Sequence, residues 1–222
     1  MLLLLQVPAV LAHTQEEVDL VCPLDGEKFK QVLSMSGTRY GQMLDLKPFG
    51  PTVAPWPLPV CPTSGFVVYR HDFQPDEIER FRTFVATPEY AAARTETPYF
   101  RVAKLQTFLG EDRSAVALSL LQATWEAESP DQYARYARDA LELYRGVLSN
   151  SKQEGKRWPL QQLVAGELER RLGLFEEARA RFTELRTLEQ FRTGVFARMV
   201  DLQLRLIDQR DTTSHQIPRR GP

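Results

Sequence analysis

The sequence predicts an α+β fold that is mainly α-helical, with a small β-rich unit at residues 13–72 and an array of antiparallel helix pairs at residues 75–209. Two observations carry this prediction. The spacing of apolar residues changes from a period of two to a period of 3.6 after residue 75, as expected when strands give way to helices. In the second part, proline repeatedly occupies positions typical of helix starts. The polar residues 210–222 are expected to form a flexible tail.

Composition narrows the class of protein. Of the 222 residues, 43% are hydrophobic and 26% are charged, so the chain can bury a core and is not expected to be disordered. Its net charge is −1, which provides no overall basic field for nucleic acid or acidic lipid. We therefore expect a folded protein that does not bind nucleic acid.

The first twelve residues, MLLLLQVPAVLA, are apolar and end in the small residues typical of a signal-peptidase site. This pattern predicts a signal peptide at residues 1–12 and an extracytoplasmic protein, either periplasmic or secreted. The alternative is a buried N-terminal strand or helix in a cytoplasmic protein. No other stretch approaches the ~18–20 apolar residues of a membrane span, so we expect none in the mature chain.

Within the β-rich unit, a turn is expected at residues 36–38 and short strands at 18–21, 29–35, 43–46 and 66–69. Residues 48–62 contain six prolines and should form a stiff, extended connection, because proline fits neither a helix interior nor a central strand. Trp56 lies in this connection. It is either a binding aromatic or a loop side chain packed over the small unit.

The helices of the second part have clear start signals. Pro75 is followed by two acidic residues, Thr87-Pro88 and Thr97-Pro98 repeat a cap-then-proline pattern, and SPDQ at 129–132 is typical of a capping box. Further along, the pattern predicts a central apolar helix at 115–125, a long apolar stripe at 133–148, a loop at 149–157 and a closing helix at 191–207.

Residues 163–185 predict two short helices joined by a turn at Gly173, where only glycine takes a left-handed conformation without steric cost. Apolar residues at helical spacing form one stripe of the second helix, at Phe175, Ala178, Phe182 and Leu185. The pattern G-x-F-x-x-A-x-x-x-F-x-x-L resembles the turn and second helix of a tetratricopeptide repeat (TPR). We therefore expect the helical array to be TPR-like.

Two short motifs, CPLDG at 22–26 and CPTSG at 61–65, are similar to the knuckles of a zinc ribbon. In a zinc ribbon, each C-P-x-C-G turn supplies two thiolates to Zn²⁺. Here the second ligand of each knuckle is replaced, by Asp25 in the first and by Ser64 in the second. The sequence thus predicts a zinc-ribbon-like unit that has lost half of its thiolates.

Three interpretations of the two cysteines remain open. Thiolates that share a zinc ion lie close together, so Cys22 and Cys61 could form a disulfide with little backbone movement, and we favour this interpretation. It requires an oxidising compartment, in agreement with the signal-like start. The second interpretation is a mixed zinc site formed by Cys22, Asp25, Cys61 and His71. The third is a pair of buried free thiols.

Four motifs together resemble the DUF2225 family of uncharacterised bacterial proteins. They are CPLDGEKF at 22–29, VCPTSGFVVYRHDF at 60–73, ATWEAESPDQYARYARDALELY at 123–144 and GELERRLGLFEEARARF at 166–182. The resemblance implies a zinc-ribbon-like N-terminus followed by a TPR-like helical C-terminus. It implies no reaction, because the function of the family is not established.

The sequence favours a non-enzymatic module for protein–protein interaction or scaffolding, in which a groove of the helical array holds a partner. Trp56, Arg170 and Arg171 are the candidate partner surface. The alternative is a cytoplasmic zinc-ribbon adaptor that touches nucleic acid or a large protein assembly. The sequence contains no G-x-S-x-G, H-E-x-x-H or phosphate-loop motif, so we expect no enzyme and no cofactor beyond the zinc considered above.

Overall fold

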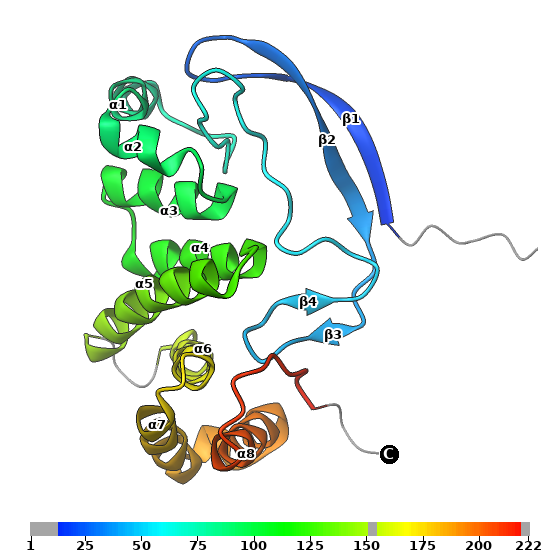
Figure 1. Cartoon of the computed structure of the whole chain (residues 1–222), viewed down its shortest axis with the longest axis vertical. Helices are drawn as coiled ribbons and strands as arrows, with labels where there is room; N and C mark the ends of the chain where they lie inside the picture. The colour runs from blue at the N-terminus through cyan, green and yellow to red at the C-terminus, as the bar shows by residue number, and fades with distance from the viewer. Residues whose placement is uncertain (1–12, 151–154, 219–222) are drawn as a thin grey trace, which may run out of the picture.

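The computed structural model describes residues 13–150 and 155–218, and it confirms an α+β fold that is mainly helical. In this part of the chain, two small antiparallel sheets precede eight α-helices. The helices stack in succession, and the N-terminal segment, residues 13–72, runs along one side of the stack from α1 to α8 (Figure 1). The predicted signal peptide at 1–12 lies outside the described residues.

The first sheet is a long hairpin of β1 (His13–Val21) and β2 (Lys28–Gly37), in a register that pairs Val21 with Lys28 and His13 with Gly37. The predicted strands at 18–21 and 29–35 are confirmed within it. The hairpin extends beyond both predicted strands. Most of its side chains face solvent, so the residues at its polar ends do not alternate between apolar and polar, and the sequence pattern does not mark them as strand. The predicted turn at 36–38 is wrong, since β2 continues to Gly37.

The rest of the N-terminal segment contains little regular strand. A second sheet pairs β3 (Gly41–Gln42) with β4 (Pro48–Phe49). The predicted strand at 43–46 is wrong: these residues form a turn between β3 and β4, and Leu46 has a positive φ of 67°. The predicted strand at 66–69 is also wrong, since Val67 forms only an isolated bridge with Val60.

The helical part confirms the predicted starts. The helices are α1 (Pro75–Val85), α2 (Pro88–Ala93), α3 (Pro98–Leu109), α4 (Arg113–Glu126), α5 (Pro130–Ser149), α6 (Trp158–Arg171), α7 (Phe175–Thr187) and α8 (Gly194–Asp208), with a short 3₁₀ turn at Glu189–Phe191. The Ser129 hydroxyl accepts a hydrogen bond from the Gln132 amide at 3.2 Å, as the capping pattern predicts. Gly173 has a φ of +76° and ends the α6 helix as expected.

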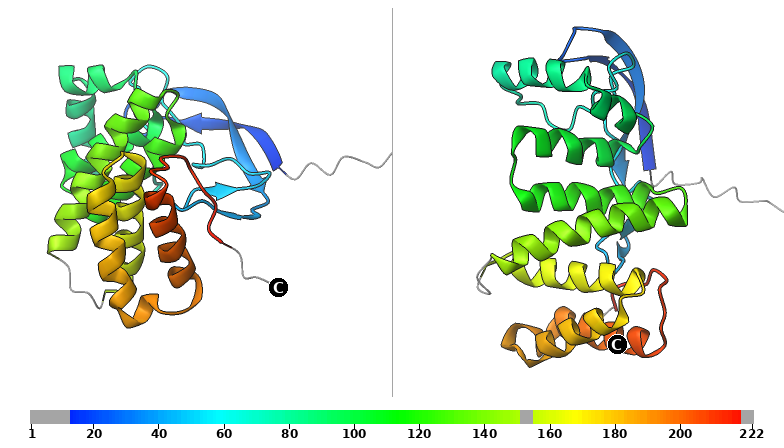
Figure 2. Two further views of the ribbon diagram at one scale, coloured as in Figure 1. Left: turned by 60° about the horizontal axis from the view of Figure 1, so that its bottom comes forward. Right: turned by 60° about the vertical axis from the view of Figure 1, so that its left-hand side comes forward.

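Consecutive helices from α3 to α8 pack against one another as layers, and the hairpin lies outside the stack (Figure 2). A buried carboxylate of α6 strengthens this packing. Glu169 is 1% exposed and bonds to Arg145 of α5 and Arg181 of α7, at 2.9 and 2.7 Å. One buried acidic group therefore joins three successive helices through charge-assisted hydrogen bonds.

The N-terminal segment has no separate core. Cys22, Leu24, Cys61, Phe66 and Val67 belong to a buried cluster with α1, α2 and α3. Leu44 belongs to the cluster of α6, α7 and α8, while Leu46 and Leu58 pack on the central cluster of α3 to α6. The segment is thus one structural unit with the helices rather than an independent domain.

The predicted flexible tail is wrong for residues 210–218. Gln216 forms an antiparallel bridge with Met43, the Leu44 amide donates to the His215 carbonyl at 2.8 Å, and Ile217 packs on the cluster of α6 to α8. These contacts hold the C-terminal end of the described chain beside β3 (Figure 1). No sequence pattern indicates this contact, because backbone hydrogen bonds, which any residue type can make, join the tail to residues 42–44.

A candidate binding surface beside the proline-rich connection

Trp56 lies on the proline-rich connection with 42% of its surface exposed. Its carbonyl accepts a hydrogen bond from the Tyr99 hydroxyl of α3 at 2.9 Å, which holds the connection against the helices. The Trp56 side chain lines a cavity of about 430 Å³ together with Arg39, Pro55 and Trp125, which we call the proline cavity. The aromatic ring is therefore positioned by the fold and accessible to a partner.

Arg171 occupies the last turn of α6. Its Nη1 atom lies 3.2 Å from a carboxylate oxygen of Asp45, which is 2% exposed, and its guanidinium stacks over the Tyr133 ring at 4.1 Å from the centroid. Burial raises the pKa of Asp45, while the Lys47 amide and the Arg171 charge act in the opposite direction. Arg171 is thus held by the N-terminal segment on one side and by α5 on the other.

A second cavity, of about 600 Å³, lies beside Arg171 where α4 ends and α5 begins, and we call it the cationic cavity. Trp125 of α4 lines both cavities, so they adjoin. The Lys47 ammonium donates to the Trp125 carbonyl at 2.9 Å and ties the N-terminal segment to this point. The structure therefore brings Trp56 and Arg171 to one surface, although 115 positions separate them in the chain.

The lining of the cationic cavity carries more positive than negative charge. Lys47, Arg138 and Arg171 line it, against one acidic residue, Glu128. Arg138 is exposed and forms no ion pair with any residue in 13–150 or 155–218. The cavity also opens at the start of α5, where the helix dipole adds partial positive charge. Such a site suits an anionic group.

Three side chains that line the cationic cavity carry a buried polar atom without a hydrogen-bond partner among the described residues. They are the Trp125 Nε1, the Tyr133 hydroxyl and the Arg171 Nε. An unpaired buried polar atom costs free energy comparable to a lost hydrogen bond. The lining of the cavity therefore carries polar atoms whose hydrogen-bonding capacity the described residues do not use.

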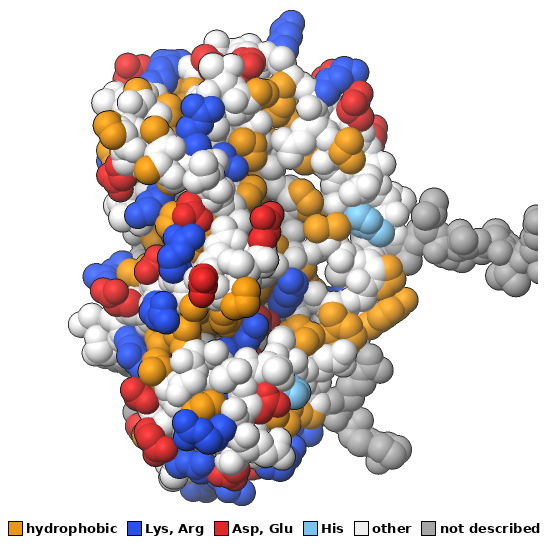
Figure 3. Space-filling model, in the orientation of Figure 1, with side chains coloured by type: hydrophobic (Ala, Val, Ile, Leu, Met, Phe, Trp, Pro, Cys, Tyr) orange, Lys and Arg blue, Asp and Glu red, His pale blue; other side chains and the backbone are white. Residues whose placement is uncertain are grey.

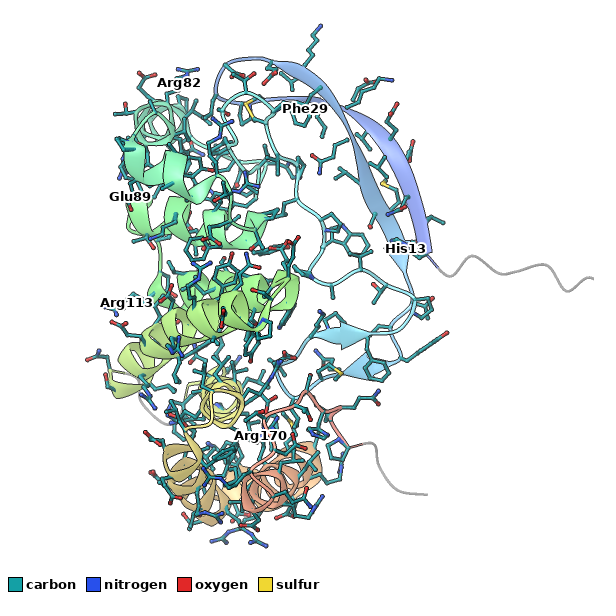
Figure 4. The ribbon with its side chains drawn as sticks, viewed as in Figure 1. His13, Phe29, Arg82, Glu89, Arg113 and Arg170 are labelled. Carbon is teal, nitrogen blue, oxygen red and sulfur yellow. A yellow bond between two sulfur atoms is a disulfide. The ribbon has the colours of Figure 1, made fainter. Side chains whose placement is uncertain are left out.

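The prediction that Arg170 belongs to a partner surface is wrong. Its side chain is completely buried, in the space enclosed by α6, α8 and the tail (Figure 4). There it forms an ion pair with Glu167 at 2.8 Å and donates to the backbone carbonyls of Asp211 and Thr213. Periodicity did not distinguish Arg170 from its neighbour because a charged residue is ordinarily expected to face solvent.

The predicted disulfide is confirmed: Cys22 and Cys61 are bonded, with their Cα atoms 5.5 Å apart. The two knuckles have matching backbone hydrogen bonds, from Gly26 to the Cys22 carbonyl and from Gly65 to the Cys61 carbonyl, both at 2.9 Å. Both glycines have positive φ angles, of 77° and 69°. The knuckles thus form two similar tight turns joined by the sulfur bridge.

The residues that replace the second thiolates close these turns. The Asp25 carboxylate accepts from the Glu27 amide at 3.0 Å, and the Ser64 hydroxyl accepts from the Phe66 amide at 3.2 Å. With both thiols bonded to each other, the mixed zinc site loses two of its four proposed ligands. Among the described residues, no group of three or more His, Cys, Asp and Glu side chains could hold a metal ion.

Sequence reasoning missed most of the lining of the two cavities. Trp125 and Tyr133 belonged to predicted helical stripes, where aromatic residues are usually core, and nothing distinguished Lys47 or Arg138. The surface forms only where the N-terminal segment crosses the α4–α5 junction, and that crossing is a tertiary contact. On the face shown in Figure 3, Lys and Arg side chains are interspersed with Asp and Glu, so overall charge gives no signal either.

Comparisons with family models, curated proteins and solved structures find no match to this chain. No helix of the described residues has both the length and the apolar character needed to cross a bilayer.

Proposed function

We propose that this protein is a non-enzymatic interaction module that holds an extended segment of a partner protein along the proline and cationic cavities. The observation that carries the proposal is that Trp125 lines both cavities, so the cavity of Trp56 and the cavity of Arg171 share a side chain. An exposed tryptophan beside a charged pocket is a common arrangement for partner recognition, because aromatic residues and arginine contribute most binding energy at interfaces.

The rigidity of the surface supports this function. Three side-chain-to-backbone or ionic contacts hold the N-terminal segment on the helices here: Tyr99 to Trp56, Lys47 to Trp125 and Arg171 to Asp45. A surface that is already ordered loses less conformational entropy when a partner binds. The helical stack then acts as the scaffold, and the binding surface lies at its contact with the N-terminal segment.

The same proposal places the protein outside the cytoplasm and in the DUF2225 family. A buried disulfide supports an oxidising compartment. The matching knuckles support descent from a zinc ribbon in which the sulfur bridge replaced the metal, and the α6–α7 pair with its Gly173 turn supports a TPR-like array. Within this proposal, the bridge performs the structural task that zinc performs in a ribbon.

The test compares proteins that co-purify with the wild type, with Trp56→Ala and with Val195→Ala. Val195 is 40% exposed at the start of α8, away from both cavities, and serves as the matched control. We expect at least one partner to be retained by the wild type and by Val195→Ala but lost from Trp56→Ala. Identical sets of partners with all three proteins would overturn the proposal.

A further inference from the structure

We infer that the cationic cavity binds a carboxylate group presented by the partner segment, so that an acidic residue anchors the partner beside Trp125. This inference rests on the proposed function and adds the chemistry of the group that is recognised. It depends on the charges that surround the cavity, on the donors that those residues leave free, and on the size of the space.

The local charge matches a monoanion. Lys47, Arg138 and Arg171 contribute three positive charges, and Glu128 contributes one negative charge. Asp45 pairs with Arg171 at 3.2 Å, and the charge of Glu126 acts on Lys47, so Arg138 is the cation of this lining that has no carboxylate partner among the described residues. A carboxylate would pair with this single charge, whereas a phosphate carrying close to two negative charges would leave an excess and repel Glu128.

The cavity offers donors that suit a carboxylate. Arg138 has no ion-pair partner among the described residues, and its planar guanidinium can donate two parallel hydrogen bonds to the two oxygens of one carboxylate. Lys47 uses one of its three ammonium donors on the Trp125 carbonyl and keeps others. The Trp125 indole N–H and the Arg171 Nε–H are buried and have no hydrogen-bond partner among the described residues, so the Trp125 signal can report on changes at the lining.

The size of the space fits a side chain presented by a peptide. The cavity of about 600 Å³ is large enough for a Glu side chain with neighbouring backbone, and the adjoining proline cavity continues the path for an extended chain. The partner segment would then place its acidic residue over α5 and its flanking residues along Trp56.

The inference is tested with short probes rather than with the unidentified partner. The probe is acetyl-Ala-Ala-Glu-Ala-Ala-amide, its control replaces Glu with Gln, and inorganic phosphate is titrated separately. Binding is followed by the NMR signal of the Trp125 indole N–H, assigned with a Trp125→Phe variant. We expect the Glu peptide to shift this signal at least tenfold more strongly than the Gln peptide or phosphate at equal concentration, and the shift to weaken at high salt.

Two charge reversals serve as a matched pair. Arg138→Glu should weaken binding of the Glu peptide by about tenfold or more, since a favourable charge becomes a repulsive one. Arg205→Glu reverses an exposed arginine on α8, outside both cavities, and should leave binding unchanged. Both variants replace solvent-exposed residues within helices, and the helical circular dichroism of each shows whether it folds as the wild type does.

Each outcome has a distinct meaning. Equal shifts from the Gln peptide, stronger binding of phosphate, or no response to Arg138→Glu would overturn the carboxylate inference. The proposed function would still be tested separately by the Trp56→Ala comparison, because that result does not depend on the charge of the partner.

Discussion

Arg170 and Glu167 lie one turn apart on α6, and they form an ion pair of 2.8 Å in which neither side chain is exposed to solvent. Gln203 of α8 completes the arrangement, since it accepts from Arg170 at 2.9 Å and donates to Glu167 at 2.7 Å. Arg170 also donates to the Thr213 carbonyl at 2.8 Å. This pair therefore couples the packing of two helices to the position of the tail.

Arg170→Ala should lower the free energy of unfolding by about 3–5 kcal/mol, because it leaves Glu167 as an unpaired buried charge. Chemical denaturation measures this loss. The double variant Arg170→Met, Glu167→Gln removes both charges and should recover part of it. If the single variant lost less than about 1 kcal/mol, the pair would have to be solvated in solution rather than buried.

Gly166→Ala should destabilise the protein although alanine favours helices by roughly 1 kcal/mol. A Cβ atom at Gly166 would lie 2.6 Å from Cε2 of the Phe182 ring, which is completely buried in the core. Such overpacking costs about 1–3 kcal/mol, which exceeds the gain in helix propensity.

Gly146→Ala is the matched control. Its nearest neighbour would be the tip of Arg113, an exposed and flexible side chain at the outer edge of the stack (Figure 4). This variant should raise the melting temperature, whereas Gly166→Ala should lower it. A rise in both variants would mean that α6 and α7 lie farther apart than the structure shows.

Removing the disulfide by Cys22→Ala with Cys61→Ala should lower the free energy of unfolding by about 4 kcal/mol, the value expected from loop-closure entropy at this separation. The bond joins residues 39 positions apart in the sequence. Urea unfolding of the two proteins measures the difference. A difference near zero would show that packing of the knuckles on α1 to α3, not the bond, fixes the loop.

The same bond can be examined in protein recovered from its own cells. Mass spectrometry under non-reducing conditions should show a chain lighter by two hydrogen atoms than the reduced form. Loss of about the first twelve residues in the same sample would agree with the predicted signal peptide. An uncut chain with two alkylated cysteines would contradict the proposed extracytoplasmic location.

Acid should release the tail. Hydrogen bonds from Thr213, with a smaller contribution from His215, lower the pKa of Asp211 from 3.8 to about 2. A carboxyl group whose pKa is lower in the folded state stabilises the fold above its unfolded pKa and loses that contribution as the pH falls through the folded value. The turn that Asp211 forms with Thr213 and His215 should therefore loosen between about pH 4 and pH 2, and with it the hydrogen bond from the Leu44 amide to the His215 carbonyl.

The NMR signals of the Leu44 and Ile217 amides report this release, since both bond across the contact between the tail and β3. In Asp211→Asn the signals should not depend on pH within that window. An identical pH profile in the wild type and the variant would assign the transition to another carboxyl group.

The helical part was predictable because its signals are local. Proline at the first turn, a capping hydroxyl such as Ser129 and a left-handed glycine such as Gly173 each act within a few residues. The disulfide was predictable because the two C-P-x-x-G turns are alike. These features depend on steric contacts and hydrogen bonds between residues that are close together in the sequence, so the sequence alone is enough to predict them.

The tail, the hairpin ends and the candidate surface were not predictable for the opposite reason. Arg170 and Arg171 are neighbours of the same type, yet one is inside the protein and the other lines a cavity. The difference arises from Gln203, Asp45 and the tail, which come from distant positions. Contacts of this kind depend on how the elements assemble and leave no periodic pattern.

The course of the N-terminal segment has a mechanical consequence. Helices stacked only on their neighbours can bend and stretch as a spring does. Here the knuckles are anchored on α1 to α3, Leu44 is anchored among α6 to α8, and Lys47 is fixed at the middle of the stack. The segment therefore connects both ends of the stack. A force that pulls α1 away from α8 must break the contacts of this segment with the helices as well as the interfaces between the helices.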